Sequence, residues 1–163
     1  MNGPDPDPPA TPHPALAALP AARRTAERIW SSGQPDTGQF PEIAKAGVDC
    51  VINLALPTSP RALPDERAVV EAAGMEYVAI PVLFEAPTEA DYLAFEQAMD
   101  GRNARGVLVH CALNYRASAF LALYRVRRLG WERGRALDDL ASFWKPEPAW
   151  QELIDRILGP AST

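Results

Sequence analysis

The sequence contains only two cysteines and two histidines among its 163 residues. Two cysteines cannot build the disulfide framework of a small secreted domain, and the chain has no zinc-ligand spacing, so we expect neither a disulfide scaffold nor a metal site. Cys50 opens an apolar segment, where the role of a small buried hydrophobe is expected. His13 lies in a proline-rich stretch. The adjacent His110 and Cys111 are therefore the pair of chemical interest.

Positive charge is in the minority, with 16 Lys and Arg against 21 Asp and Glu and a formal net charge of −5. This balance argues against nucleic acid as a partner, although a locally positive pocket can still bind a phosphorylated protein or small molecule. The chain lacks a run of about 18 apolar residues, so no membrane span is expected. Residues 1–5 lack the basic region of a signal peptide. We expect a cytoplasmic protein, and the composition leaves its oligomeric state open.

Proline is concentrated at the start of the chain, where residues 1–20 hold seven of the 17 prolines. Such a segment cannot pack a core, so residues 1–23 are predicted to form a flexible extended tail. The remainder has the length and apolar content of one domain, predicted over residues 24–160.

Apolar segments alternate with amphipathic ones along this domain. Strands are predicted over residues 28–32, 48–54, 75–82 and 107–109. Helices are predicted after Thr37 and Thr88 and over residues 65–73, 118–129, 133–143 and 149–158. This alternation predicts an α/β fold with a central, mostly parallel sheet of four to five strands flanked by helices. Ligands of such sheets bind beyond the carboxyl ends of the strands.

Residues 110–118 read His-Cys-Ala-Leu-Asn-Tyr-Arg-Ala-Ser and lie between an apolar strand and an apolar helix. Backbone N–H groups at a helix N-terminus and the helix dipole bind anions. The same field favours the thiolate form of a cysteine, which is its nucleophilic form. The pattern therefore favours Cys111 as a nucleophile over a buried structural thiol, and Arg116 as an anion ligand over a surface ion-pair partner.

These residues resemble the signature of the protein tyrosine and dual-specificity phosphatase superfamily, which is His-Cys, five residues, Arg, then Ser or Thr. Residues 31–35, 47–54 and 74–82 are similar to an atypical bacterial branch of it, also found fused to beta-lactamase-like hydrolases. The resemblance covers roughly residues 28–157. It implies a cysteine-phosphatase-like fold and hydrolysis of phosphate monoesters through a phosphocysteine intermediate, without metal or organic cofactor.

The resemblance also implies residue roles. Cys111 would be the nucleophile, Arg116 would bind the phosphoryl oxygens, and Ser118 would assist the leaving thiolate or serve only as the helix cap. Glu85 is the best positional match to the general acid, with a solvated loop charge as the alternative and Asp91 as the next carboxylate. The rest of the phosphate-binding loop would comprise His110, which orients it, and Ala112, Leu113, Asn114, Tyr115 and Ala117.

The loop departs from the signature in two places. Arg116 lies five positions after Cys111 instead of six, and Ala117 occupies the family's arginine position, whereas Ser118 keeps its register. Asn114 replaces the usual glycine, and Asn is the non-glycine residue that best tolerates a positive φ.

Two other functions stay open. Rhodanese-like sulfurtransferases have a loop of the same length, with four residues between the cysteine and the arginine. In these enzymes the thiolate carries a persulfide. A non-catalytic pseudo-phosphatase that binds phosphate without turnover is the second alternative.

Asn53, a polar residue in an apolar strand, is expected to bond to a neighbouring loop, and the cysteine loop is the natural partner.

Overall fold

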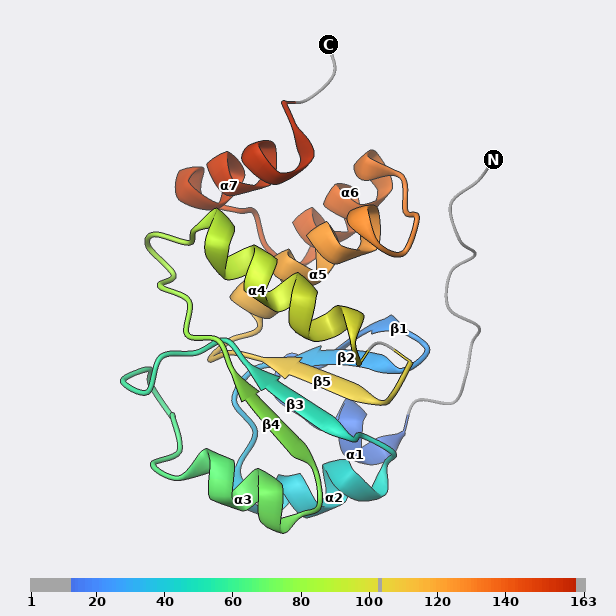
Figure 1. Cartoon of the computed structure of the whole chain (residues 1–163), viewed down its shortest axis with the longest axis vertical. Helices are drawn as coiled ribbons and strands as arrows, with labels where there is room; N and C mark the ends of the chain where they lie inside the picture. The colour runs from blue at the N-terminus through green and yellow to red at the C-terminus, as the bar shows by residue number, and fades with distance from the viewer. Residues whose placement is uncertain (1–12, 103, 161–163) are drawn as a thin grey trace.

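The computed structural model describes residues 13–102 and 104–160, which form a five-stranded sheet between two layers of helices (Figure 1). The strand order is β1-β2-β5-β3-β4. β1 pairs with β2 in antiparallel fashion, and the other neighbours are parallel. The strands are β1 (Arg23–Ala26), β2 (Ile29–Ser32), β3 (Cys50–Asn53), β4 (Glu76–Ala79) and β5 (Val107–His110). The predicted α/β class and mostly parallel sheet are confirmed.

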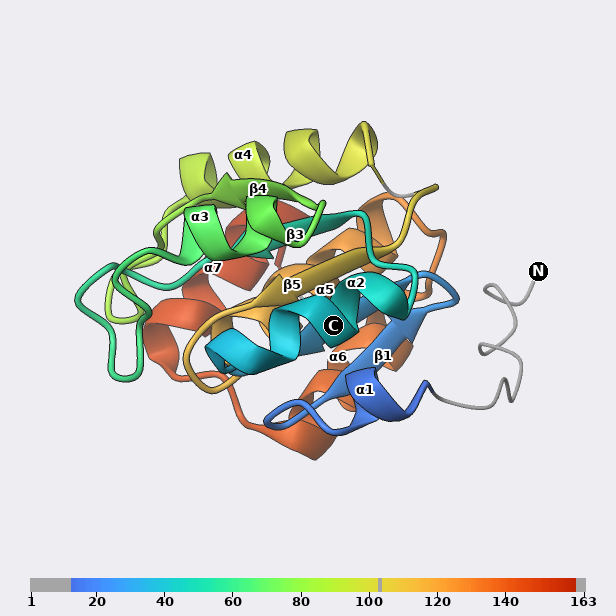
Figure 2. The same ribbon diagram turned by 90° about the horizontal axis from the view of Figure 1, so that it is seen from below.

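Helices cover both faces of the sheet in two layers, as Figures 1 and 2 show. The first layer contains α1 (Pro14–Ala17), α2 (Phe40–Lys45), which follows a 3-10 turn at Thr37–Gln39, and α3 (Glu66–Ala72). The second contains α4 (Glu89–Asp100), α5 (Tyr115–Arg127), α6 (Arg133–Phe143) and α7 (Pro148–Leu158). No helix in the described ranges is long and apolar enough to cross a bilayer.

The central strands are apolar on both faces because each face is covered. In β3, Val51 packs into the core under α1–α3 while its neighbour Ile52 packs into the core under α4–α7, and both are fully buried. In β5, Leu108 likewise packs into the core under α1–α3, and Val109 packs into the core under α4–α7. Alternate side chains of a strand point to opposite faces, so a doubly covered strand needs an almost continuous apolar run.

The helix α5 lies at the centre of the second layer, and nearly all of it is buried. It begins at Tyr115, three residues before the predicted start at Ser118. Asn114 adopts a left-handed conformation with φ 70° and turns the chain directly from the loop into the helix. The cysteine loop is therefore shorter than expected, and Arg116 lies in the first helical turn.

The packed chain begins before the predicted boundary at residue 24. Leu16 and Leu19 are buried in the core under α1–α3, because these two leucines supply apolar surface that the surrounding prolines do not. β1 was not predicted, since its sequence Arg-Arg-Thr-Ala lacks apolar alternation. As an edge strand it buries only Thr25, and charged residues suit such an edge. The earlier part of the predicted tail lies outside the described residues.

We predict that Glu96 on α4 stabilises the fold above acidic pH. Its buried carboxylate accepts hydrogen bonds from Arg127 at 2.5 Å, Arg128 at 2.9 Å and the Tyr92 hydroxyl at 2.9 Å. Arg127 is the main cause that holds the pKa of Glu96 below its ordinary value of 4.5. A depressed folded-state pKa adds stability above pH 4.5 that is lost as the pH falls.

Glu96→Gln should therefore lower the free energy of unfolding by about 1–3 kcal/mol at pH 7. The difference from the natural protein should shrink as the pH falls below about 4.5. Urea unfolding at pH 7 and at pH 3.5 measures both values. A difference that is equal at the two pH values would contradict this role of the carboxylate.

Candidate active site

Cys111 follows β5 directly, at the edge of the sheet where the parallel strands end (Figure 1). Main-chain hydrogen bonds from both neighbouring strands hold this point of the chain. The N–H of Cys111 donates to the carbonyl of Ser32 at 3.3 Å, and the N–H of Leu54 donates to the carbonyl of His110 at 2.8 Å. The position of the thiol is thus set by the sheet itself.

The segment after β2 packs tightly against the cysteine loop. The N–H of Gln34 donates to the carbonyl of Ala112 at 3.0 Å. A Cβ atom added to Gly33 would lie 2.6 Å from that carbonyl oxygen, closer than real Cβ contacts occur. Only glycine allows this approach of the two backbones. The Gly-Gln-Pro turn is therefore part of the support of the loop.

The loop presents a row of backbone N–H groups without protein acceptors. Within residues 13–102 and 104–160, no acceptor pairs with the N–H groups of Ala112 to Ala117, and the first bond of α5 runs from Ser118 to the carbonyl of Asn114. The left-handed Asn114 is the N-cap residue of α5, so the last of these groups lie in the first turn of the helix. Such an array, reinforced by the helix dipole, binds an oxyanion.

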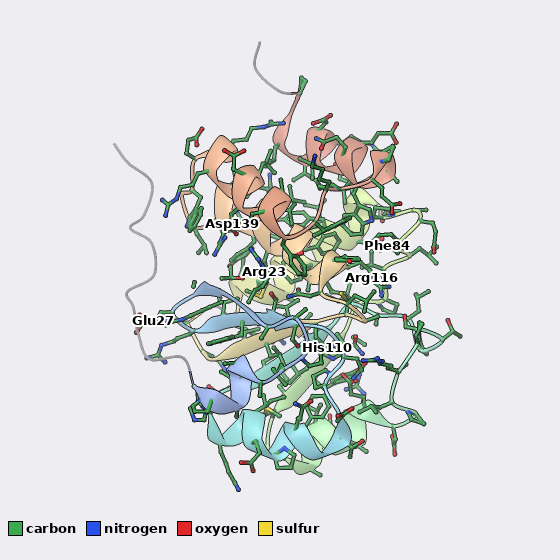
Figure 3. The ribbon with its side chains drawn as sticks, turned by 180° about the vertical axis from the view of Figure 1, so that it is seen from behind. Arg23, Glu27, Phe84, His110, Arg116 and Asp139 are labelled. Atoms are coloured by element: carbon green, nitrogen blue, oxygen red, sulfur yellow. The ribbon has the colours of Figure 1, made fainter. Side chains whose placement is uncertain are left out.

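Arg116 extends from the first turn of α5 to the loop that follows β4. Its Nη1 donates to the carbonyl of Val82 at 2.9 Å, and the side chain lines the same pocket as Cys111. Figure 3 shows Arg116 beside Phe84, at the ends of the strands. The early start of α5 brings Arg116 to this place although it lies one position early in the signature.

His110 contacts the backbone of the loop from beneath. Its Nδ1 lies 3.2 Å from the carbonyl oxygen of Cys111, and its Nε2 lies 2.6 Å from Oε2 of Glu66 on α3. A carbonyl only accepts, so Nδ1 is the donor in its contact with Cys111. Gln34 donates to the other oxygen of Glu66 at 2.8 Å.

All three side chains of this network are buried. The expected orienting contact of His110 is thus present. Glu66 was missed in the sequence because it lies far from the loop in the chain and has the pattern of an ordinary first-turn acid.

A pocket of about 480 Å³ opens beside the thiol. Its wall includes Cys111, which is itself only 1% exposed. Of the residues that the sequence assigned to the site, five others line this pocket: Glu85, Ala112, Leu113, Tyr115 and Arg116. Four do not line it, namely His110, Asn114, Ala117 and Ser118.

Ser118 is engaged elsewhere. Its hydroxyl donates to the carbonyl of Tyr115 at 3.1 Å and accepts a hydrogen bond from the indole of Trp144 at 3.0 Å. It does not cap α5, because the N-cap position falls at Asn114. The hydroxyl therefore has two partners in the structure, and Cys111 is neither of them.

Two carboxylates line the pocket from the side of α7. Glu85 lies on the loop after β4, and Glu147 immediately precedes α7. This loop is anchored because the indole of Trp150 donates to the carbonyl of Phe84 at 2.8 Å and the two rings pack together. Glu147 was missed because the sequence places it far from the cysteine.

Asp91, the expected next carboxylate, is engaged in the capping box of α4 with Thr88 and does not line the pocket. The prediction for Asn53 is also corrected. Its side chain donates to the Tyr77 hydroxyl at 3.0 Å and accepts from the N–H of Ala55 at 2.9 Å, so it braces its own strand end and not the cysteine loop.

Comparison with known proteins places this site in a family. No family model matches the chain. The fold superimposes on a DUF442 candidate phosphatase from Shewanella putrefaciens with a TM-score of 0.79 and 39% identity, over 88% of this chain and 94% of that one. The chain belongs to this phosphatase-like family.

Two further comparisons agree with that assignment. The beta-lactamase hydrolase-like protein of Xylella fastidiosa is 37% identical over 103 residues, which are 61% of this chain and 24% of the relative. The chain thus spans about a quarter of that longer protein. TpbA of P. aeruginosa, in complex with pTyr, superimposes with a TM-score of 0.67 at 20% identity, over 92% of this chain and 93% of that one, which shows a shared fold.

The two cysteines of this phosphatase-like domain differ in their surroundings. Burial raises the pKa of the Cys50 thiol to about 11, and the nearby Glu76 carboxylate adds to this effect. Both cysteines are buried in the same core, but Cys111 also lines the pocket and Cys50 does not. In the described ranges, no three His, Cys, Asp or Glu side chains gather in a way that could hold a metal ion.

We therefore expect iodoacetamide to label Cys111 much faster than Cys50 near neutral pH, because the thiolate is the reactive form. Phosphate or vanadate should protect Cys111. Mass spectrometry of the two cysteine peptides over time measures each rate, and Cys111→Ser provides the background. Equally slow labelling of both thiols, with no protection by anions, would mean that Cys111 is inert.

Gly33→Ala tests the support of the loop. The added methyl group must push the Ala112 carbonyl away, so we expect a stability loss of about 1–3 kcal/mol and weaker vanadate binding. Gly38→Ala is the matched control, since a Cβ there meets nothing within 4 Å. Urea unfolding and vanadate titration of both variants measure these effects. Equal vanadate affinity in the two variants would show that the loop does not depend on this contact.

Proposed function

We propose that the chain hydrolyses phosphate monoesters through a phosphocysteine intermediate. The observation that carries this proposal is that Cys111 lines a pocket and directly precedes the N–H groups of Ala112 to Ala117, which have no acceptor among the described residues. A nucleophile beside preorganised donors is what transfer of a phosphoryl group needs. Membership in a phosphatase-like family supports the same reaction class.

In the first step, the Cys111 thiolate attacks phosphorus, a sulfur–phosphorus bond forms, and the bond to the leaving oxygen breaks. The N–H groups of the loop and the Arg116 guanidinium hold the three equatorial oxygens. A carboxylic acid protonates the leaving oxygen. Glu85 is the proposed acid, because it lines the pocket on a loop anchored by Trp150.

In the second step, water attacks the phosphocysteine and the same carboxylate accepts its proton. Inorganic phosphate leaves and the Cys111 thiolate is restored. Every group in this scheme comes from the chain, so it calls for no metal or organic cofactor. A free reactive thiol suits a reducing compartment, which supports a cytoplasmic location.

The substrate is a phosphorylated molecule. The pTyr complex of the structurally similar TpbA supports an aryl phosphate as one class. The side chains of Leu56, Phe84 and Tyr115 line the pocket and offer an aromatic leaving group apolar contacts.

Binding without turnover is the second candidate function. The observation that favours it is the hydrogen bond of Arg116 to the Val82 carbonyl, which occupies part of a guanidinium that the transition state needs. An aryl phosphate assay decides between the two functions. Turnover that Cys111→Ser abolishes supports the phosphatase, whereas phosphate binding without turnover supports the binding protein. Thiosulfate with cyanide tests the sulfurtransferase alternative.

Glu85→Gln and Glu147→Gln form a matched pair for identifying the acid, since both carboxylates line the pocket. Glu85→Gln should slow hydrolysis of a phosphate ester with a poor leaving group by about 10²–10⁴-fold. Nitrophenyl phosphate should be affected far less, because nitrophenolate leaves without a proton. The kcat of both variants on both substrates is measured. If only Glu147→Gln shows this selectivity, the acid is Glu147.

A further inference from the structure

The loop between β3 and α3 presents an arginine to the pocket on a hydrogen-bonded turn. The N–H of Ala62 donates to the carbonyl of Ser59 at 3.0 Å, and the two central residues are Pro60 and Arg61. Arg61 has a φ of 65°. Proline at the second position and a positive φ at the third define a type II turn. The segment before this turn is held by a hydrogen bond from the Leu56 N–H to the Ser59 hydroxyl at 3.1 Å.

The third position of a type II turn favours glycine or asparagine, because a side chain at positive φ is strained. A left-handed conformation costs an ordinary residue on the order of 1–2 kcal/mol. In the part of the chain that the structure describes, no hydrogen bond or ion pair of the Arg61 guanidinium offsets this cost. An arginine in this conformation is thus unfavourable for the turn, and a function outside the fold explains it.

The surroundings of Arg61 indicate that function. It lines the same pocket as Cys111 and is exposed. Glu85 and Glu147 line the same pocket from other elements, the loop after β4 and the residue before α7. No described ion pair joins Arg61 to either of them. The pocket lining therefore combines a cation on the β3–α3 loop with two carboxylates from other parts of the fold.

The pocket also exceeds what a phosphoryl group needs. A phosphoryl group on the N–H row occupies only the part of the 480 Å³ space next to Cys111. The remaining lining includes Leu56, Pro60 and Leu113, which suit an uncharged body of the leaving group. Arg61 lines the same pocket, so its guanidinium is available to a second charged group of the ligand.

We propose that Arg61 forms a second anion subsite, so that the preferred ligand is a phosphomonoester whose leaving group carries a further anionic group. The proposal rests on the proposed function only for the identity of the first anion. Phosphate binds at the cysteine loop, the leaving group spans the apolar lining, and its second anion pairs with the guanidinium. The carboxylates of Glu85 and Glu147, which line the same pocket, repel that anion and favour its pairing with Arg61.

The experiment measures binding, so that it does not depend on turnover. Phenyl phosphate, 3-carboxyphenyl phosphate and 4-carboxyphenyl phosphate are titrated by calorimetry into Cys111→Ser protein, which cannot form the phosphocysteine. At least one carboxylated ester should bind roughly tenfold tighter than phenyl phosphate, as one charge-assisted hydrogen bond provides. The same titrations are repeated with Arg61→Asn added.

Arg61→Asn is the sharpest variant because asparagine tolerates the positive φ and removes the charge. Its melting temperature should equal or exceed that of the parent, so lost binding cannot be attributed to unfolding. Its preference for the carboxylated ester should disappear while its affinity for phenyl phosphate stays the same. Arg61→Lys is the matched control, which keeps the charge and should retain much of the preference.

Equal affinity of the three esters in the parent protein would overturn the subsite, as would a preference that survives Arg61→Asn. The proposed phosphatase activity is tested separately. It is overturned, while the subsite stands, if the natural protein hydrolyses none of the three esters but the Arg61-dependent preference is present. Conversely, hydrolysis of all three esters with no effect of Arg61→Asn on binding would leave the activity standing and remove the subsite.

Discussion

The contact of the β2–α2 turn with the cysteine loop is the constraint on which the rest of the site depends. Gly33 allows two backbones to approach so closely that no side chain fits between them, and Gln34 bonds to the same loop carbonyl. Once this carbonyl is fixed, only a short segment remains before α5 starts at Tyr115. The anion site is thus built from main-chain geometry, and the side chains refine it.

Beneath this contact, the buried pair of His110 and Glu66 couples the loop to α3. Two buried ionisable groups stabilise a fold only when their hydrogen bonds are complete, since desolvation opposes their attraction. Here Gln34 and the Cys111 carbonyl supply the missing partners. Gln34 thus supports the loop in two ways. Its backbone N–H donates to the Ala112 carbonyl, and its side chain donates to Glu66. The network links three elements that are distant in sequence at the point where Cys111 lies.

The sequence predicted what depends on local patterns. The parallel strands, the capped helix α4 and the approximate place of the loop follow from apolar periodicity and capping chemistry, and the structure confirms them. The structure differs where a long-range contact decides. β1 is polar and is a strand only because β2 offers a free edge. α5 begins early because Asn114 reaches Ala21 with its side chain at 2.7 Å, a bond that no local pattern announces.

The site residues follow the same division. Cys111, Arg116 and Glu85 were found because they lie in or beside recognisable motifs, and all three line the pocket. Glu66, Glu147 and Arg61 were missed because each belongs to the site only through the fold. Arg61 does carry a local signal, since a proline followed by an arginine in a tight turn places the arginine where glycine is preferred.

The position of Arg61 on this turn bears on which parts of the pocket would set the reaction and which would set the specificity. The cysteine loop is held by the sheet, and the loop of Glu85 is held by Trp150, so the two segments that we propose to bind phosphate and to protonate the leaving group are both anchored to the fold. The Arg61 turn is held mainly by bonds within itself. We therefore infer that the Arg61 turn recognises the leaving group, because this turn can change with the least effect on the core. A change of specificity then needs substitutions only on this turn, whereas a change of reaction would require the sheet to move.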